Sequence, residues 1–330
     1  MLRWMAMVSL LTSLVFLPGA ALALDGKLTE VTITSKSLPN PVPVTIYTPP
    51  GYDPNRLEPY PLLVQLHGGG GSNKNMDRMA ILLEQAIKQG LVPPMVSVMP
   101  SAGRSFYMDY RDGSQKWEQF VAVDLLADIR KRTHVVQGRK GTFITGISMG
   151  GMGSLRIAFK HPDLFQAVAS QEPGIEPALA VGDIQLRDRF WRSDALQQEI
   201  YGLPVDAAYW ALNNPATIAQ KDPSRLVGLG IYLEAGDQDM FFLHSGTEFV
   251  HRVLYDAAIA HEYRLVRGAE HVGPSIGPRF LDAMGFIGRQ ITPPVWITDE
   301  VVRTRAYVDA QKRAAGYPVI PVDPSRIRTR

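Results

Sequence analysis

Residues 146–151 read Gly-Ile-Ser-Met-Gly-Gly. A β-strand pattern ends where it begins, and a helical pattern opens directly after it. The G-x-S-x-G spacing is typical of a sharp strand-to-helix turn, which needs glycine on both sides because the backbone is crowded there. Such a turn lifts the Ser148 hydroxyl above the sheet edge, beside the positive end of the helix dipole. The stretch predicts Ser148 as a nucleophile, with a structural Gly-Ser turn as the alternative.

Outward from this turn, strand and helix patterns alternate along the chain. Short apolar runs are typical of interior parallel strands, and the residues between them show apolar side chains at helical spacing. The pattern predicts an α/β fold with a mostly parallel sheet of about eight strands and helices on both faces. The expected strands, of which the first two are antiparallel, cover residues 31–34, 42–47, 62–66, 95–99, 142–145, 167–169, 231–233 and 263–266.

The two ends of the chain differ from this pattern. Residues 1–23 have an early cation, an apolar run and a small-residue cleavage site, which predicts a secretory signal peptide. An uncleaved membrane anchor is the alternative, but the apolar run is short for a span. Residues 24–298 are the predicted catalytic domain. Residues 299–330 are expected to form a C-terminal helix and an extended tail, to which no chemistry is assigned.

One internal segment, residues 174–226, also interrupts the alternation. It carries Trp191 and Trp210 in short helical pieces and shows no clear strand pattern. An insertion that follows a sheet strand often forms a lid over a pocket. The alternative interpretation is a surface segment that packs against the domain through its aromatic side chains.

Composition excludes several classes of function. The chain of 330 residues is 45% hydrophobic and 20% charged, which is ordinary for a globular protein. Its net charge of +2 gives no electrostatic reason to expect nucleic acid or an anionic membrane as a partner. The absence of cysteine excludes disulfides, thiolate metal sites and a cysteine nucleophile.

A serine nucleophile needs a base, and the base needs an orienting acid. Among the seven histidines, His271 lies in a glycine-flanked loop just past the last predicted strand. The turn after the strand at 231–233 offers two carboxylates, Asp237 and Asp239. The spacing favours Asp239 as the acid and Asp237 as a brace of the turn. The resulting order Ser, Asp, His is that of the α/β-hydrolases.

A second glycine run, residues 67–72, directly follows an apolar strand. Acyl transfer needs two backbone N–H donors for the oxyanion, and glycine lets the backbone approach the substrate closely. The predicted donors are Met149 and Gly69, with Gly70 as the next choice for the second. A phosphate-binding loop is the rival, but no Gly-Lys-Ser/Thr sequence follows.

With these motifs in place, the chain resembles the esterase D-like branch of the α/β-hydrolases over about residues 28–290. That branch includes S-formylglutathione hydrolases, feruloyl and acetyl-xylan esterases and secreted mycolyltransferases. Residues 105–110 and 116–120 also resemble the family's S-F-Y-x-D-W and W-E-x-F motifs. In that resemblance, this stretch lines the acyl or leaving-group side of the site. The segment 174–226 and the tail match no family pattern.

The resulting hypothesis is an exported serine carboxylesterase, secreted or periplasmic, that needs no metal or cofactor. Its substrates would be small-molecule or polysaccharide-linked esters, with feruloyl and acetyl esters in view. The alternatives are an acyltransferase of the mycolyltransferase type, an S-formylglutathione hydrolase-like thioesterase, and a non-catalytic binding protein. The expected substrate-binding residues are aromatic: Tyr107, Trp117, Trp191 and Trp210.

Overall fold

The protein is described by a computed structural model that covers residues 24–188 and 193–319. Within these residues, the chain forms an eight-stranded sheet in the order β1-β2-β4-β3-β5-β6-β7-β8. The predicted α/β fold with a sheet of about eight strands is confirmed. The strands are β1 (Lys27–Ile33), β2 (Val42–Thr48), β3 (Leu62–Leu66), β4 (Val96–Pro100), β5 (Thr142–Ile147), β6 (Ala167–Gln171), β7 (Gly230–Gly236) and β8 (Glu262–Val266).

The sheet is antiparallel at one edge and parallel across the rest. β2 runs antiparallel to both of its neighbours, β1 and β4. From β4 through β3 and β5 to β8, every pairing is parallel. Six carboxyl ends therefore meet at one edge of the sheet, which is where ligands bind in open α/β sheets.

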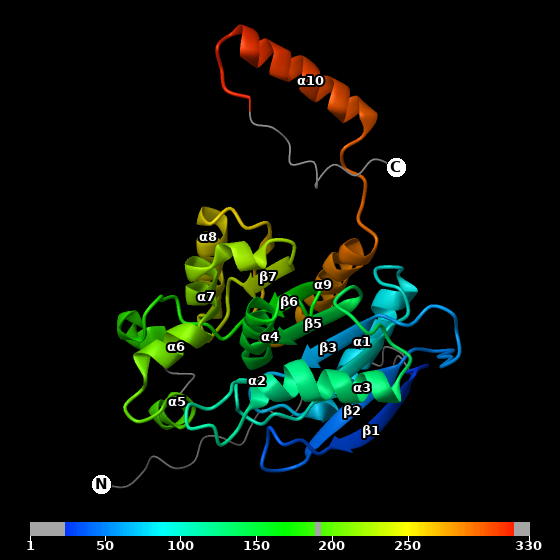
Figure 1. Ribbon diagram of the computed structural model, residues 1–330, viewed down its shortest axis with the longest axis vertical. Coiled ribbons are helices and arrows are strands. Elements are labelled where there is room, and N and C mark those ends of the chain that lie inside the picture. Colours follow the sequence, from blue (N-terminus) through cyan, green and yellow to red (C-terminus); the bar gives the residue numbers. More distant parts are fainter. Residues whose placement is uncertain (1–23, 189–192, 320–330) are drawn as a thin grey trace.

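Side chains of the interior strands alternate between two apolar cores because successive residues of a strand point to opposite faces. On β3, Leu62 and Val64 belong to one core and Leu63 to the other. Helices α1 and α9 pack on the Leu63 face, while α3, α4 and α8 pack on the opposite face (Figure 1). These helices are α1 (Met76–Lys88), α3 (Leu126–Arg132), α4 (Met149–Lys160), α8 (Leu243–Asp256) and α9 (Ile276–Ile291).

The segment 174–226 forms short helices in its described part, as the sequence predicts. Its aromatic residues Tyr201 and Trp210 are buried in the same core as α4, which makes this segment part of the packed domain. The longer helices here are α5 (Asp194–Tyr201), α6 (Ala207–Asn213) and α7 (Pro215–Lys221). Two 3-10 turns, Val181–Asp183 and Leu186–Asp188, precede them, and a third, Pro223–Leu226, follows them. Shorter helical pieces elsewhere are Asn73–Asn75, α2 (Trp117–Gln119) and a π-helical turn at Phe120–Leu125.

At the C-terminal end, α10 (Asp299–Ala314) stands away from the sheet on an extended connection (Figure 1). The side chains of Trp296 and Tyr307 on this segment are exposed. The predicted signal peptide, residues 1–23, lies outside the described residues. Over residues 24–188 and 193–319, no helix combines the length and the apolar character that a membrane span requires.

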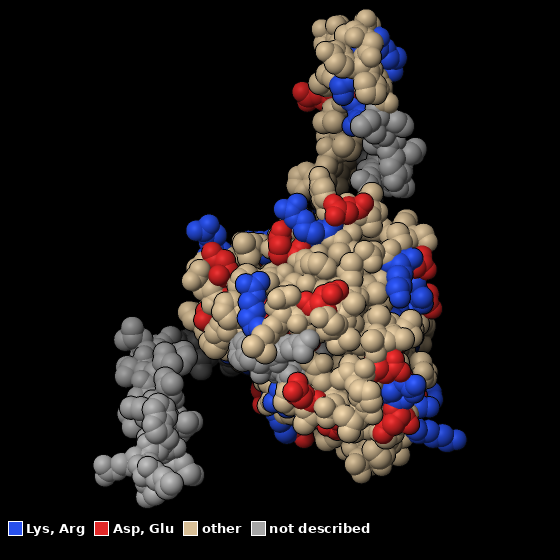
Figure 2. Space-filling model, turned by 90° about the vertical axis from the view of Figure 1, so that its left-hand side faces the viewer, with Lys and Arg blue, Asp and Glu red and all other residues tan. Residues whose placement is uncertain are grey.

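The surface shown in Figure 2 carries Lys and Arg side chains interspersed with Asp and Glu side chains. No extended area of one sign covers that face, in agreement with the small net charge of +2.

Candidate active site

The Ser148 turn has the backbone geometry that its sequence predicts. Ser148 lies between β5 and α4 with φ 58° and ψ −118°, a conformation that non-glycine residues rarely adopt. Its N–H donates to the carbonyl of Gln171 at the end of β6, which anchors the turn to the sheet. A Cβ atom on Gly146 would overlap the carbonyl oxygen of Gly150, and one on Gly150 would overlap that of Leu66. Both glycines are therefore required by close backbone approach.

His271 lies in the loop between β8 and α9, and its side chain lines the same cleft as Ser148. Its Nδ1 is 2.9 Å from Oδ2 of Asp239, which follows β7. The other oxygen of Asp239 accepts the N–H of Phe241 at 2.7 Å, and both Asp239 and His271 are buried. The structure thus brings the predicted serine, acid and histidine to one sheet edge.

Asp237, the alternative acid, faces away from the imidazole. Its carboxylate accepts the N–H of Gly268 at 2.7 Å and pairs with Arg267 at 3.0 Å. These contacts join the turn after β7 to the loop after β8. Asp237 accordingly has the geometry of a turn brace.

A second carboxylate, Glu172, also lies against His271, and sequence reasoning missed it. Its Oε2 is 2.8 Å from His271 Nδ1, and its Oε1 is 2.5 Å from Arg279 on α9. Burial alone would lower the pKa of His271, but the hydrogen bond to Asp239 and the contact with Glu172 outweigh it and raise the pKa to about 9. The available signal was an acid placed directly after a parallel strand.

The glycine loop at residues 67–72, which carries the predicted oxyanion donor Gly69, is fixed by His67. The Nε2 atom of His67 accepts the N–H of Ala102 at 2.9 Å, so the proton is on Nδ1, which lies 2.8 Å from the carbonyl oxygen of Gly68. Burial lowers the pKa of His67, which keeps the ring neutral in this role. Gly68 packs beside Ser148, and the space around Gly69 is open. The first N–H groups of a helix have no intrahelical acceptor, and Met149 is the first residue of α4.

The cleft above Ser148 has a volume of 580 Å³ and lies at the carboxyl edge of the sheet. Its walls are mainly backbone and apolar side chains, and among the described residues that line it Arg104 is the one permanent charge. Aromatic and aliphatic walls come from Phe106, Phe241, Leu243, Val272 and Ile276.

The predicted aromatic substrate contacts are corrected by the structure. Tyr107 is fully buried, and its hydroxyl donates to the carbonyl of His67 at 3.2 Å. Trp117 is half-buried against Phe120, and Trp210 is 1% exposed within the core. None of these three is among the residues that line the cleft, because Tyr107 and Trp210 lie in the core and Trp117 packs against it. Trp191 lies outside the described residues.

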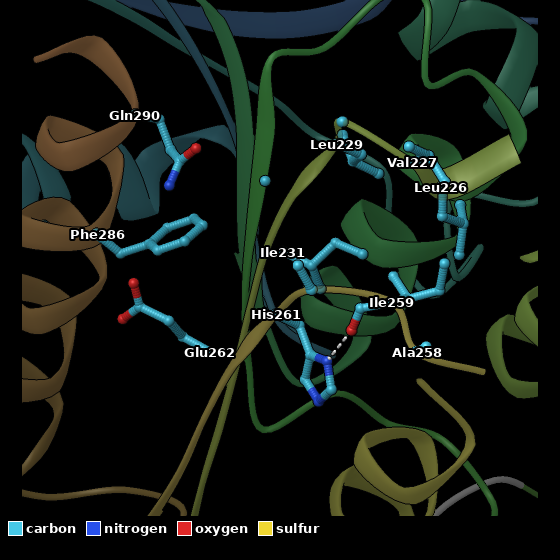
Figure 3. Close-up of a pocket in the computed structure, with 13 residues that line it drawn as sticks. Leu226, Val227, Leu229, Ile231, Ala258, Ile259, His261, Glu262, Phe286 and Gln290 are labelled. Atoms are coloured by element: carbon cyan, nitrogen blue, oxygen red, sulfur yellow. Dashed lines mark hydrogen bonds between the residues drawn. The ribbon is translucent and has the colours of Figure 1, made fainter. Parts of the chain in front are cut away.

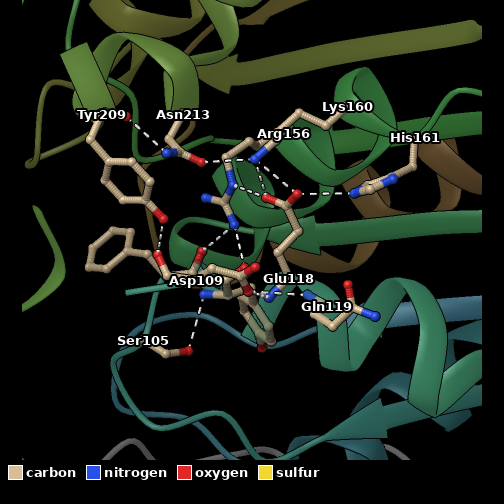
Figure 4. A network of polar contacts seen from close by, with 11 residues as sticks. Ser105, Asp109, Glu118, Gln119, Arg156, Lys160, His161, Tyr209 and Asn213 are labelled. Atoms are coloured by element: carbon tan, nitrogen blue, oxygen red, sulfur yellow. Dashed lines mark hydrogen bonds and ion pairs between the residues drawn. The ribbon is translucent and has the colours of Figure 1, made fainter. Parts of the chain in front are cut away.

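A buried polar network supports the Tyr107 segment (Figure 4). Arg156 on α4, which is fully buried, donates to the carbonyls of Phe106 and Tyr107, two residues with positive φ. Its guanidinium also pairs with Glu118 at 3.3 Å. Through Tyr107 and His67, this network braces the glycine loop at residues 67–72.

A second hollow lies at the opposite, amino-terminal edge of β7 and β8 (Figure 3). Leu229, Ile231 and Phe286 give it apolar walls, and His261 turns its Nδ1 to the carbonyl of Ile259 at 2.7 Å. Because ligands of open α/β sheets bind at the carboxyl edge, no function is assigned to this hollow.

Glu172, Asp239 and His271 place ligand atoms within 4.8 Å of one another, which raises the question of a metal. Arg279 donates to Glu172, and its positive charge opposes a cation at this position. His271 Nδ1 already has Asp239 as its hydrogen-bond partner. We therefore interpret the cluster as acids paired with a histidine and an arginine.

The sheet order and the strained serine turn at its carboxyl edge are those of an α/β-hydrolase. Residues 35–276 match the family model Esterase, described as "Putative esterase". The chain belongs to this family, which confirms the resemblance and makes its class that of the carboxylic ester hydrolases.

Individual relatives match shorter stretches of the chain. An acetyl esterase of Caldicellulosiruptor saccharolyticus is 29% identical over 106 residues, which are 32% of this chain and 38% of that protein. An endo-1,4-beta-xylanase/feruloyl esterase of Xylanibacter ruminicola is 24% identical over 152 residues, 42% of this chain and 20% of that protein. The chain thus spans well under half the length of these two relatives.

Among solved structures, a ferulic acid esterase superposes with a TM-score of 0.67 at 20% sequence identity. The superposition covers 82% of this chain and 100% of the other. At this identity the likeness establishes the shared fold.

Proposed function

We propose that this chain is an exported serine carboxylesterase, in which Ser148, His271 and Asp239 form the catalytic triad. The observation that carries the proposal is the 2.9 Å contact between His271 Nδ1 and Asp239, in the cleft that Ser148 enters from a strained turn. A strained turn that exposes one hydroxyl beside a carboxylate-oriented imidazole is the arrangement that nucleophilic acyl transfer requires.

The reaction proceeds in two halves. Ser148 Oγ attacks the ester carbonyl while neutral His271 takes its proton at Nε2, and Asp239 stabilises the imidazolium that forms. The N–H groups of Met149 and Gly69 bind the oxyanion. His271 then gives the proton to the departing alcohol, which leaves an acyl group on Ser148. Water, deprotonated by His271, attacks this acyl-enzyme and releases the carboxylic acid and the free serine.

The proposed substrates are acetyl and feruloyl esters attached to polysaccharides. Support comes from the two relatives, an acetyl esterase and an endo-1,4-beta-xylanase/feruloyl esterase, and from a cleft whose walls are largely apolar. An apolar wall suits an acyl or aryl group, and its open mouth leaves room for a sugar. The proposal of export is supported by the signal-peptide pattern of residues 1–23. Polysaccharide-linked esters are substrates that an exported enzyme would meet.

The test is a panel of chromogenic esters of graded acyl length and aryl character, run with the wild-type protein and Ser148→Ala. We expect kcat to fall by about 10⁴ or more in Ser148→Ala, because the covalent route is lost. A fluorophosphonate probe should label the wild-type protein and leave Ser148→Ala unlabelled.

Near-normal turnover in Ser148→Ala would overturn the mechanism. Absence of fluorophosphonate labelling in the wild-type protein would favour a non-catalytic binding protein instead. If added alcohols or sugars accept the acyl group faster than water does, the protein is an acyltransferase with the same triad.

A further inference from the structure

We propose that Glu172 is a second orienting carboxylate for His271, which acts beside Asp239 to hold the imidazole and to stabilise its protonated form. The inference rests on the proposed esterase function, since it concerns the base of that reaction. Glu172 is a positioning residue: it touches His271, not the reacting atoms.

The topology brings the two acids together. Glu172 directly follows β6 and Asp239 follows β7, and these strands are parallel neighbours. Oε1 of Glu172 accepts the N–H of Gly236, and its own N–H donates to the carbonyl of Glu234, so that the residue is fixed to β7. Its φ of 42° lies in the left-handed region, which glutamate rarely adopts, and its side chain is fully buried. A strained, buried acid of this kind persists only where the surroundings hold it in place.

The two carboxylates contact the same nitrogen in different ways. Asp239 accepts the hydrogen bond from Nδ1, at 2.9 Å. Glu172 Oε2 lies as close, at 2.8 Å, but no donor of the described residues is aligned with that oxygen. Glu172 therefore interacts with His271 electrostatically, without an aligned hydrogen bond. A modest rotation of the ring would turn the N–H from Asp239 to Glu172, so that the same tautomer has two available acceptors.

The charges around His271 are unequal in number. Three buried acids, Glu172, Glu234 and Asp239, face one permanent cation, Arg279. Arg279 holds Oε1 of Glu172 and both oxygens of Glu234, which leaves Oε2 of Glu172 to His271.

The other neighbours of the imidazole add no balancing charge. The Glu270 carboxylate is turned to the backbone N–H groups of Met240 and His271, and Phe241 packs its ring edge-on at 4.7 Å. Burial raises the pKa of Glu234, and Arg279 offsets this only in part. A proton on His271 relieves the excess of negative charge.

The decisive experiment measures the titration of His271 directly and does not depend on turnover. The imidazole resonances of His271 are followed against pH by NMR in the Ser148→Ala protein, with and without Glu172→Gln. We expect Glu172→Gln to lower the His271 pKa by about one unit or more, since an adjacent negative charge is lost. The matched control is Glu234→Gln, which also removes an acid from Arg279 but does not touch His271, and should shift the pKa much less.

A second measurement uses activity. Asp239→Asn in the wild-type background should retain turnover at least tenfold above that of Ser148→Ala, because Glu172 still accepts the Nδ1 proton. The double variant Glu172→Gln/Asp239→Asn should fall to the Ser148→Ala level. In Glu172→Gln alone, the rising limb of kcat/KM against pH should move to lower pH while KM stays nearly constant.

The proposal is overturned if the His271 pKa is the same with and without Glu172→Gln, or moves equally in Glu234→Gln. It is also overturned if Asp239→Asn alone is as inactive as Ser148→Ala; this comparison decides the matter if Glu172→Gln does not fold. Failure of the esterase function would be recognised separately, as wild-type protein that neither hydrolyses esters nor reacts with a fluorophosphonate.

Discussion

Two buried arginines stand on either side of the candidate site, and their surroundings differ in sign. Arg156 supports the Tyr107 segment, and there the carboxylate of Glu118 contacts Arg156, Lys160 and His161. Arg279 lies beneath the histidine, where it is shared by the carboxylates of Glu172 and Glu234. In the ion pairs of the first cluster, two permanent cations, Arg156 and Lys160, share one carboxylate. In those of the second, two carboxylates share one permanent cation.

This difference separates a structural role from a chemical one. Burial opposes ionisation of Glu118, but the hydrogen bond from His161 and the charges of Arg156 and Lys160 lower its pKa to about 2. Glu118 therefore stays charged and keeps the Arg156 network fixed at all ordinary pH values. Around Arg279 the pKa values of Glu234 and His271 are both raised, so this cluster favours a proton on His271. His271 is the residue that takes up and releases a proton in the proposed reaction.

The largest effect expected from the acid-rich side is that of Asp239→Asn. We expect kcat to fall by about 10²–10³, less than the loss of about 10⁴ known for a triad acid with no substitute, because Glu172 remains. Asp237→Asn is the matched control, two residues away in the same turn, and should cost less than about tenfold. Steady-state kinetics on one chromogenic ester would compare them. If Asp237→Asn proves the more damaging change, the acid has been assigned to the wrong residue.

On the cation-rich side, Glu118→Gln should reduce stability and leave the chemistry alone. It removes the carboxylate that faces fully buried Arg156, and an uncompensated buried charge typically costs about 3–5 kcal/mol in free energy of unfolding. Denaturant unfolding would measure this loss. Lys160→Gln removes a half-exposed partner of the same acid and should cost less than about 1 kcal/mol.

The distinction between the two arginine clusters would be contradicted if Glu118→Gln shifted the pH dependence of kcat/KM. In that case the Arg156 network would act on His271 electrostatically, and the division into a structural and a chemical cluster would be wrong.

The fold was predictable because its signals are local. The interior strand β3, for example, is a largely apolar run, and a parallel sheet buried on both faces favours such runs. The candidates Ser148, Asp239 and His271 could be selected because each follows a strand within a recognisable motif. Their approach to one another was the expected consequence of parallel strands ending at one edge.

The role of Glu172 could not be predicted, because it depends on which strands are neighbours in the sheet. Glu172 lies in no motif, and only the adjacency of β6 and β7 brings it to His271. The predicted substrate contacts of Tyr107, Trp117 and Trp210 were wrong for a different reason. An aromatic side chain can fill a core as well as line a cleft, so its residue type alone does not distinguish the two. Tyr107 and Trp210 fill the core, whereas Phe241, unremarkable in the sequence, faces the cleft.

The two clusters should also differ in how the wild-type protein responds to pH. In the proposed mechanism His271 must be neutral to accept the Ser148 proton, so kcat/KM should rise with pH along a limb near pH 9. Because the folded pKa lies above the unfolded value of about 6.5, its stabilising contribution is complete below pH 6.5 and is lost as pH rises through 9. For Glu118 the sign is reversed, and its contribution disappears as pH falls from about 4.5 to 2.

Activity profiles and unfolding curves across this pH range would check both signs. A kcat/KM limb near pH 6.5 would mean that the acids do not raise the basicity of His271.

The smallest effect is expected from the packing of Phe241 against His271, which involves no charge. Phe241 holds its ring edge-on to His271 at 4.7 Å and lines the cleft, while its neighbour Phe242 is 46% exposed and does not line it. An aromatic contact of this kind contributes about 0.5–1.5 kcal/mol, so Phe241→Leu should lower kcat/KM by roughly two- to tenfold. Phe242→Leu, the matched control, should change it by less than about twofold. If Phe241→Leu instead exceeded Glu172→Gln in its effect on the pH limb, the imidazole would be held chiefly by packing, and the acid-rich cluster would lose its special role.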